Sequence, residues 1–295
     1  VYVRGKILLP RTRRDFFRND PTRLMSLFAD MQRHRAIMSE TASRAIYQEL
    51  ALVDDEYRRD PDVAKVFLGI MANPFHLDDV VRRMHWTGLL GAYLPEFDRL
   101  TCLVQHDYYH AYTADEHSIV TVQRMTSLAE KTNESLVAQV YRSVSHKTVG
   151  HLAALLHDIG KSGGHGHSER GAEMSVDISD RLGLSEYEKN LLAFLIAHHL
   201  LLSHISQRRD IDDMAMIRQV SEQFADTTSL DLLYVLAWSD MNATQAEPLS
   251  KWKLTLLDTL YTRIRPLIEQ RTNGGTRDMR GVIESPEKYL SLIHI

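Results

Sequence analysis

The chain has 295 residues, with 35 Lys and Arg against 39 Asp and Glu and a formal net charge of −4 at pH 7. No basic run predicts a nucleic-acid partner, and no apolar stretch approaches the roughly 20 residues of a membrane span. The single cysteine, Cys102, excludes an internal disulfide and a cysteine-rich zinc site, which favours a cytoplasmic location.

Residues 1–95 are predicted to form a helical lead-in without convergent chemistry. We interpret its first residues as the remnant of a preceding domain. Asp20-Pro21 is typical of a helix start, with Asp as the N-cap and Pro in the first turn, and the same device recurs at Asp60-Pro61. A further helical run covers residues 39–52, and no β-sheet is predicted anywhere in the chain.

A second group of helices is predicted to begin at Thr113, because Thr113-Ala-Asp-Glu116 has the pattern of a capping box. His117 then falls in the first turns of this helix. Taken alone, a histidine there is more simply an exposed residue of the cap region. Its companions further along the chain reverse that preference.

The stretch from His151 to Lys161 carries the clearest chemistry. Its leucines recur at helical spacing, and His157 and Asp158 project from one turn at the end of this apolar helix. Both side chains are costly to bury unless they are paired or bound, and the usual partner is a divalent metal. Lys161, one turn later, would place its ammonium near an anion held at that metal. A His-Asp pair alone is weak evidence, so other segments must supply further ligands.

Histidine is concentrated in this part of the chain, since 11 of the 15 histidines lie between His106 and His204. A metal site would produce such clustering. His167 lies at the end of a glycine-rich loop, before a helix predicted to be capped near Ser168. A capping box at Ser185-Glu-Tyr-Glu188 starts an apolar helix that ends at His198-His199. These two histidines are either a solvated pair or ligands, and the clustering favours ligands.

The last candidate ligand is an acid on an apolar helix. Leu230, Leu233, Tyr234 and Ala237 predict a nearly wholly apolar helix whose buried face carries Asp240. A carboxylate at this position would be heavily penalised unless a cation or a hydrogen-bond donor met it. A final helix is predicted from Ser250 to about Arg265-Pro266.

His117, His157, Asp158 and Asp240 thus offer two imidazoles and two carboxylates from three helices. Such a mixed set suits a borderline or hard divalent ion. The pattern resembles the HD superfamily of metal-dependent phosphohydrolases, an all-helical fold. That resemblance implies His167, His198 and His199 as candidate ligands of a second ion. From the mixed donor set we expect magnesium or manganese as the metal, with iron or zinc as alternatives.

A closer resemblance is to the bifunctional PII uridylyltransferase/uridylyl-removing enzymes of bacterial nitrogen control. It covers roughly residues 15–270 and implies an all-α HD helical bundle at 96–270 behind the lead-in at 1–95, with a linker or tail at 271–295. The motifs that carry it lie at residues 90–97, 105–117, 151–161, 167–173, 198–202, 207–210 and 252–253.

The reaction that this resemblance implies is hydrolysis of the phosphodiester between UMP and a tyrosine of the uridylylated PII protein, with release of UMP. Asp158 would hold the metal, and Lys161 would balance charge on the phosphoryl oxygens. His167 or His199 would assist the leaving tyrosine as an acid.

The family's nucleotidyltransferase and ACT domains have no counterpart in this sequence. Uridylyl transfer and glutamine sensing are therefore expected only outside this chain. The last residues, Leu290 to Ile295, depart from the family's continuation, and we interpret them as translated sequencing adapter at the end of an environmental gene fragment.

Three other interpretations stay open. The first is an HD enzyme that hydrolyses a nucleotide or a cyclic dinucleotide. The second is a non-catalytic module that binds PII and carries a structural metal. The third is a metal-free helical bundle whose histidines form hydrogen bonds in its core. The last of these leaves Asp240 unexplained.

Overall fold

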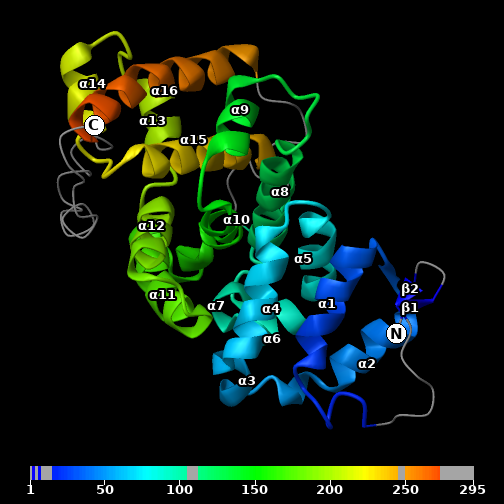
Figure 1. Ribbon diagram of the computed structural model, residues 1–295. Helices are drawn as coiled ribbons and strands as arrows, with labels where there is room; N and C mark the ends of the chain where they lie inside the picture. The colour runs from blue at the N-terminus through cyan, green and yellow to red at the C-terminus, as the bar shows by residue number, and fades with distance from the viewer. Residues whose placement is uncertain (1, 4–5, 8–14, 105–111, 245–249, 273–295) are drawn as a thin grey trace.

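The computed structural model describes the chain apart from residues 1, 4–5, 8–14, 105–111, 245–249 and 273–295, and this part is dominated by helices (Figure 1). The predicted all-α class is confirmed. The described strands have two residues each, too few to leave an alternating pattern in the sequence. They form one small sheet in the order β1 (Tyr2–Val3), β2 (Lys6–Ile7) and β3 (Ile37–Met38), antiparallel and then parallel.

The lead-in is a set of short helices, and its predicted helix starts have different outcomes. Asp60 caps α4 as predicted, because its carboxylate accepts from the backbone N–H groups of Asp62 and Val63. The carboxylate of Asp20 instead accepts from the Thr22 hydroxyl, and α1 begins at Arg23 with Thr22 as its N-cap, two residues later than predicted. The helices are α1 (Arg23–His34), α2 (Glu40–Gln48), η1 (Leu50–Leu52), α3 (Asp55–Arg59), α4 (Pro61–Ala72), α5 (Leu77–Trp86), α6 (Leu89–Tyr93) and α7 (Pro95–Asp98).

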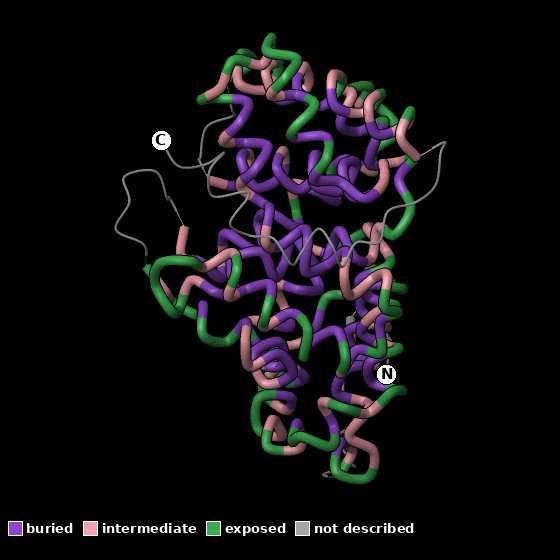
Figure 2. Tube along the Cα trace, turned by 90° about the vertical axis from the view of Figure 1, so that its left-hand side faces the viewer, coloured by how far each residue is buried: buried purple, intermediate pink, exposed green. Residues whose placement is uncertain are grey.

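The second group of helices surrounds α10, which packs against α8, α12 and α15 and also against α4 of the lead-in (Figure 1). Buried segments gather in the interior, and exposed residues lie along the outer turns (Figure 2). The elements are α8 (Ala114–Ser127), α9 (Leu136–Ser143), α10 (Lys147–Leu156), η2 (Ile159–Gly163), α11 (His167–Leu182), α12 (Glu186–Ala197), α13 (Leu201–Arg208), α14 (Met214–Ser221), α15 (Thr227–Ala243) and α16 (Lys251–Thr272).

Two capping boxes were expected here, and one of them forms. Ser185 and Glu188 exchange the reciprocal bonds of a capping box at the start of α12. At the start of α8 the Thr113 side chain makes no capping bond, and Glu116 pairs with Arg82 of α5 instead. The prediction of a helix start was therefore right at Thr113, but the stabilising contact comes from another helix.

The last helix is longer than predicted, because α16 continues through Pro266 to Thr272. A proline costs a backbone hydrogen bond in a helix interior. Tertiary contacts offset that loss, since Ile268 is fully buried and Arg271 donates to the carbonyl oxygens of Ser221 and Phe224. Propensity at one position is here outweighed by packing.

Helix α15 runs through the interior and carries, besides Asp240, a second buried acid that was not predicted from the sequence. Asp231 and Asp240 are each 7% exposed. Asp231 accepts from the Tyr261 hydroxyl at 2.7 Å and from Arg265 Nε at 3.3 Å, both on α16. It is therefore a core acid whose hydrogen bonds are satisfied.

Within the described residues, no helix is both long enough and apolar enough to span a bilayer.

Candidate metal centre

Three helix segments bring the four predicted primary ligands together. His117 lies in the first turn of α8, His157 is the C-cap of α10 with Asp158 directly after it, and Asp240 lies near the end of α15. These three helices pack against one another. All four side chains are almost completely removed from solvent.

The four side chains meet within hydrogen-bond or near hydrogen-bond distance. His117 Nε2 lies 3.2 Å from His157 Nε2 and 3.7 Å from Asp158 Oδ2. His157 Nε2 lies 3.2 Å from the same Asp158 oxygen. Asp240 Oδ1 completes the group, at 2.9 Å from His117 Nε2 and 3.7 Å from His157 Nε2. We call these four residues the first group.

A second group shares Asp158 with the first. Asp158 Oδ1 lies 3.7 Å from His167 Nε2 and 3.8 Å from His199 Nε2, and the two imidazole nitrogens are 3.4 Å apart. One carboxylate oxygen of Asp158 thus faces each group. His167 is the first residue of α11, and His199 follows the end of α12.

Backbone carbonyls fix which nitrogen two of these imidazoles present. His157 Nδ1 donates to the carbonyl of Ala154 at 3.0 Å, and His199 Nδ1 donates to that of Ile196 at 2.7 Å. A carbonyl oxygen only accepts, so the proton of each neutral ring resides on Nδ1. The Nε2 lone pair then points toward Asp158, which is the orientation that metal-binding histidines adopt.

Charge interactions within the first group favour a bound cation. Burial alone would lower the pKa of His157, but the carboxylates of Asp158 and Asp240 raise it above its ordinary value. Burial would likewise raise the pKa of Asp158 and of Asp240, yet nearby imidazoles hold both below the usual carboxyl range. The site therefore attracts positive charge, which a proton or a metal ion supplies.

The second group is electrostatically different. Burial lowers the pKa of His199 to about 3 and also lowers that of His167. Both rings are therefore neutral at physiological pH. The His199 side chain is 1% exposed whereas that of His167 is 24% exposed, so solvent reaches His167 more readily.

Lys161 lies at the edge of both groups. Its Nζ is 2.7 Å from Asp158 Oδ2, and its side chain is 12% exposed. It comes from η2, three residues after Asp158.

The spacing of these atoms fits divalent ions. Nitrogen and oxygen ligands bind such ions at about 2.1 Å, which places neighbouring ligand atoms about 3.0 to 3.5 Å apart. The ligand atoms of His117, His157 and Asp158 all lie within 4.8 Å of one another, and so do those of Asp158, His167 and His199. Both groups therefore present the donors and the spacing that a divalent ion needs.

His198 does not join either group. It is buried like His199, but its ring stacks on Phe194 at 4.5 Å between centroids and its Nδ1 donates to the Phe194 carbonyl. Burial lowers its pKa to about 4. The predicted ligand pair His198-His199 is thus divided, with one ring in the core and one beside Asp158. The motif residues 105–111 lie outside the part of the chain that the structure describes.

Sequence reasoning missed the close approach that supports the second group. The backbones of Gly160 in η2 and Gly171 in α11 nearly touch, and a Cβ on Gly160 would lie 2.7 Å from Gly171 N. Arg170 closes the same loop by donating to the carbonyls of Gly160 and His165, each at 2.6 Å. The sequence signal was the His167-Ser-Glu-Arg-Gly171 segment, to which no role for Arg170 was assigned.

Comparison with known proteins yields two matches to family models in the order expected from the sequence. Residues 2–93 match the uridylyltransferase GlnD third domain, and residues 114–225 match the HD domain. The HD match contains every candidate ligand except Asp240.

Relatives named bifunctional uridylyltransferase/uridylyl-removing enzyme match most of the chain. That of Nitrosococcus oceani is 35% identical over 259 residues, 86% of this chain and 29% of the relative. That of Bordetella avium is 33% identical over 289 residues, 96% of this chain and 33% of the relative. The chain therefore spans about a third of the length of these relatives.

Proposed function

The chain belongs to the GlnD third-domain family over residues 2–93 and to the HD domain family over residues 114–225, and from this we propose that it removes UMP from uridylylated PII by metal-dependent hydrolysis. The observation that carries the proposal is the meeting of His117, His157 and the carboxylates of Asp158 and Asp240. The names of the relatives support the uridylyl-removing activity.

The first group would hold one divalent ion, and the second group would hold another through the shared Asp158. Magnesium or manganese fits best, because hard ions favour carboxylate oxygens and accept neutral imidazole, whereas zinc and iron remain the alternatives. When bound, such an ion supplies Lewis acidity that activates water near neutral pH and offsets charge on phosphoryl oxygens.

The reaction adds the oxygen of water to phosphorus, breaks the bond from phosphorus to the tyrosine oxygen, and returns a proton to that oxygen. Lys161 is placed to stabilise the charge on the phosphoryl group, since its ammonium lies at the edge of the site beside Asp158. It would bind phosphate as a point charge and orient the phosphodiester.

His167 is the better candidate of the two proposed acids. It is partly exposed, so a bound tyrosine oxygen can reach it, whereas His199 is enclosed and carries its proton on Nδ1 toward a carbonyl. A tyrosine oxygen is a fair leaving group, so the hydrogen bond that the neutral ring of His167 can donate would suffice. His199 then serves as a ligand alone.

The test is release of UMP from uridylylated PII by the purified chain. We expect release that stops with chelator and returns with Mn²⁺ or Mg²⁺. Release that persists after complete removal of metal, or no release with any divalent ion, contradicts the proposal.

Two control substrates separate the other interpretations. Faster hydrolysis of free nucleotides or cyclic dinucleotides than of uridylylated PII would assign the chain to a different HD activity. Binding of PII that survives chelation, without turnover under any condition, would identify a non-catalytic binding module.

A further inference from the structure

The first turn of α8, which carries His117, is held from outside by helix α5 of the lead-in. Arg82 of α5 pairs with Glu116, and His85 Nε2 of the same helix lies 3.0 Å from Asp115 Oδ2. These two acids directly precede His117 in the sequence. Two successive contacts from one helix therefore fix the turn from which the ligand projects.

The contacts from α5 occur at the N-terminus of α8, which has no side-chain cap. The Thr113 side chain caps no backbone N–H group of this turn, so the contacts from α5 contribute to its position. Asp115 also accepts from the backbone N–H of Cys102 at 3.3 Å. The His85 and Asp115 side chains are 14% and 7% exposed, and those of Arg82 and Glu116 are 20% and 30% exposed. Such partly buried pairs restrict motion more than surface pairs do.

We propose that Arg82 and His85 are positioning residues for the metal centre, acting through the first turn of α8 on His117. The inference rests on the proposed metal-dependent function. Its physical basis is the narrow tolerance of ligand distances, about 0.2 Å in a metal site. His117 Nε2 lies between His157 and Asp240, so a small rotation of this turn moves it away from both. The lead-in is then part of the hydrolase.

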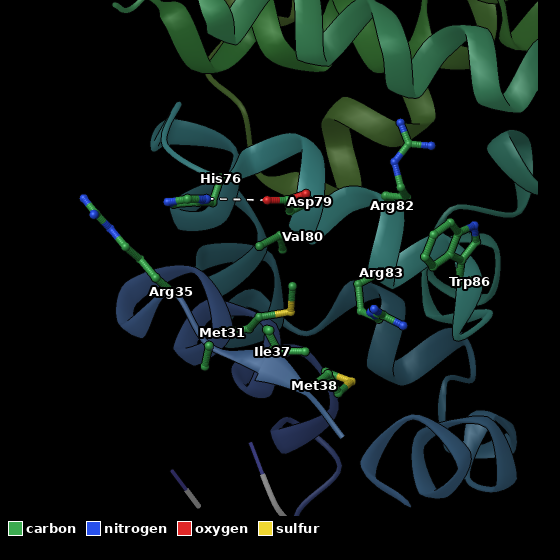
Figure 3. Close-up of a pocket in the computed structure, with 11 residues that line it drawn as sticks. Met31, Arg35, Ile37, Met38, His76, Asp79, Val80, Arg82, Arg83 and Trp86 are labelled. Atoms are coloured by element: carbon green, nitrogen blue, oxygen red, sulfur yellow. Dashed lines mark hydrogen bonds and ion pairs between the residues drawn. The ribbon is translucent and has the colours of Figure 1, made fainter. Parts of the chain in front are cut away.

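Helix α5 also supplies a matched control on its own surface. Arg82 and Arg83 both border a cavity of about 420 Å³ between α5 and the end of α1, and their side chains leave the helix in different directions (Figure 3). The Arg83 guanidinium lies 5.2 Å from the centre of the Trp86 ring. Substitution of Arg83 removes the same charge from the same helix but leaves the Arg82 contact to Glu116.

A second control tests loss of an ion pair in general. Arg181 of α11 pairs with Glu96 of α7 at 2.9 Å, and their side chains are 13% and 16% exposed. This pair links separate elements as the Arg82 pair does, and is at least as buried. Unlike Glu116, neither Arg181 nor Glu96 directly precedes a candidate ligand in the sequence.

The experiment measures the dissociation constant of Mn²⁺ by calorimetry on the whole chain, beside thermal unfolding and UMP release. For Arg82→Gln we expect Mn²⁺ binding to weaken by about tenfold, the lower end of the effect of outer-shell partners. Glu116→Gln should act in the same direction. The exchange Arg82→Glu with Glu116→Arg should restore affinity toward the wild-type value, which a general loss of stability would not do.

The controls decide the result. Arg83→Gln should retain wild-type Mn²⁺ affinity, and Arg181→Gln should lower the unfolding temperature without weakening Mn²⁺ binding. Equal affinities for Arg82→Gln and Arg83→Gln, or equal weakening by Arg181→Gln, would overturn the inference. A wild-type chain that binds Mn²⁺ but releases no UMP refutes the proposed reaction and leaves this inference standing on the affinities alone.

Discussion

His117 Nε2 lies 3.2 Å from His157 Nε2, although 40 positions separate the two residues in the chain. Because His157 donates its Nδ1 proton to a backbone carbonyl, its Nε2 lone pair faces the other ring and two carboxylates. Lone pairs and negative charges brought this close need a cation between them.

Asp158→Asn should remove metal and hydrolysis together. Asp158 faces both groups with different oxygens, so its loss affects every candidate ion. We expect UMP release to fall by more than about 100-fold, beyond the range for outer-shell partners, with metal content measured on the same protein. Asp177→Asn changes an exposed acid of α11 and should leave both quantities unchanged. Retention of wild-type turnover by the Asp158 variant would contradict the assignment.

Asp240→Ala and Asp231→Ala should separate a ligand from a core acid on the same helix. Both residues are equally buried in α15, but Asp240 faces His117 whereas Asp231 faces Tyr261 and Arg265. Asp240→Ala should weaken Mn²⁺ binding by at least about tenfold. Asp231→Ala should leave binding intact and lower the free energy of unfolding by about 1–3 kcal/mol, because it leaves the buried Tyr261 hydroxyl without its acceptor. Equal effects of the two variants on Mn²⁺ affinity would refute the distinction.

Features that depend on neighbouring residues could be predicted from the sequence. The caps at Asp60 and Ser185 form because a carboxylate or hydroxyl reaches backbone N–H groups within three residues. The apolar stripe before His157 places that residue and Asp158 at the end of a buried helix for the same local reason.

Features that depend on packing between distant segments could not be predicted. His198 and His199 are adjacent, yet only His199 faces Asp158, because neighbouring residues project in different directions and the sequence does not show which one meets a partner. The pairing of Glu116 with Arg82 replaces the expected capping box for a similar reason. The structural role of Asp231 could not be predicted either, because its partners Tyr261 and Arg265 lie on another helix, α16.

Mn²⁺ affinity should increase with pH. The carboxylates raise the pKa of His157 above the ordinary histidine value of about 6.5. A proton therefore still competes with the metal ion for His157 Nε2 when the pH is above that ordinary value. Affinity should therefore rise as the pH passes through the raised pKa of His157, and then level off. Calorimetry in buffers of different ionisation enthalpy checks this, because it also counts the protons released. An affinity that is constant between about pH 6 and pH 9 would contradict the role of His157.

In the chelated protein the same groups have opposite effects on stability. The raised pKa of His157 gives stabilisation that is fully present below its unfolded pKa and is lost as the pH rises through its folded pKa. The lowered pKa values of Asp158 and Asp240 give stabilisation that is present above the ordinary carboxyl pKa and is lost in acid. Unfolding by denaturant across this pH range, with and without Mn²⁺, measures both trends.

His199→Ala should reduce the number of bound ions from two to one. His199 belongs only to the second group, so the first group keeps all four of its ligands. Equilibrium dialysis against Mn²⁺ counts the ions. His198→Ala is the matched control. The His198 ring stacks on Phe194, so its removal should lower stability and leave the number of bound ions unchanged. A wild-type chain that binds a single ion would refute the second site.

Gly160→Ala should impair the site without altering any ligand. A Cβ at this position would collide with the carbonyl of His167 and lie 2.7 Å from Gly171 N, and neither backbone atom can rotate away. Such overpacking costs about 1–3 kcal/mol. To relieve it, η2 must move from α11, which separates Asp158 and Lys161 from His167. A displacement of about 1 Å can reduce turnover by about a hundredfold, and we expect UMP release to fall on that scale. Gly69→Ala is the control, because its Cβ would meet nothing within 4 Å and alanine favours the helix. If Gly160→Ala matched Gly69→Ala in both unfolding and UMP release, the close approach of η2 and α11 would have no part in forming the site.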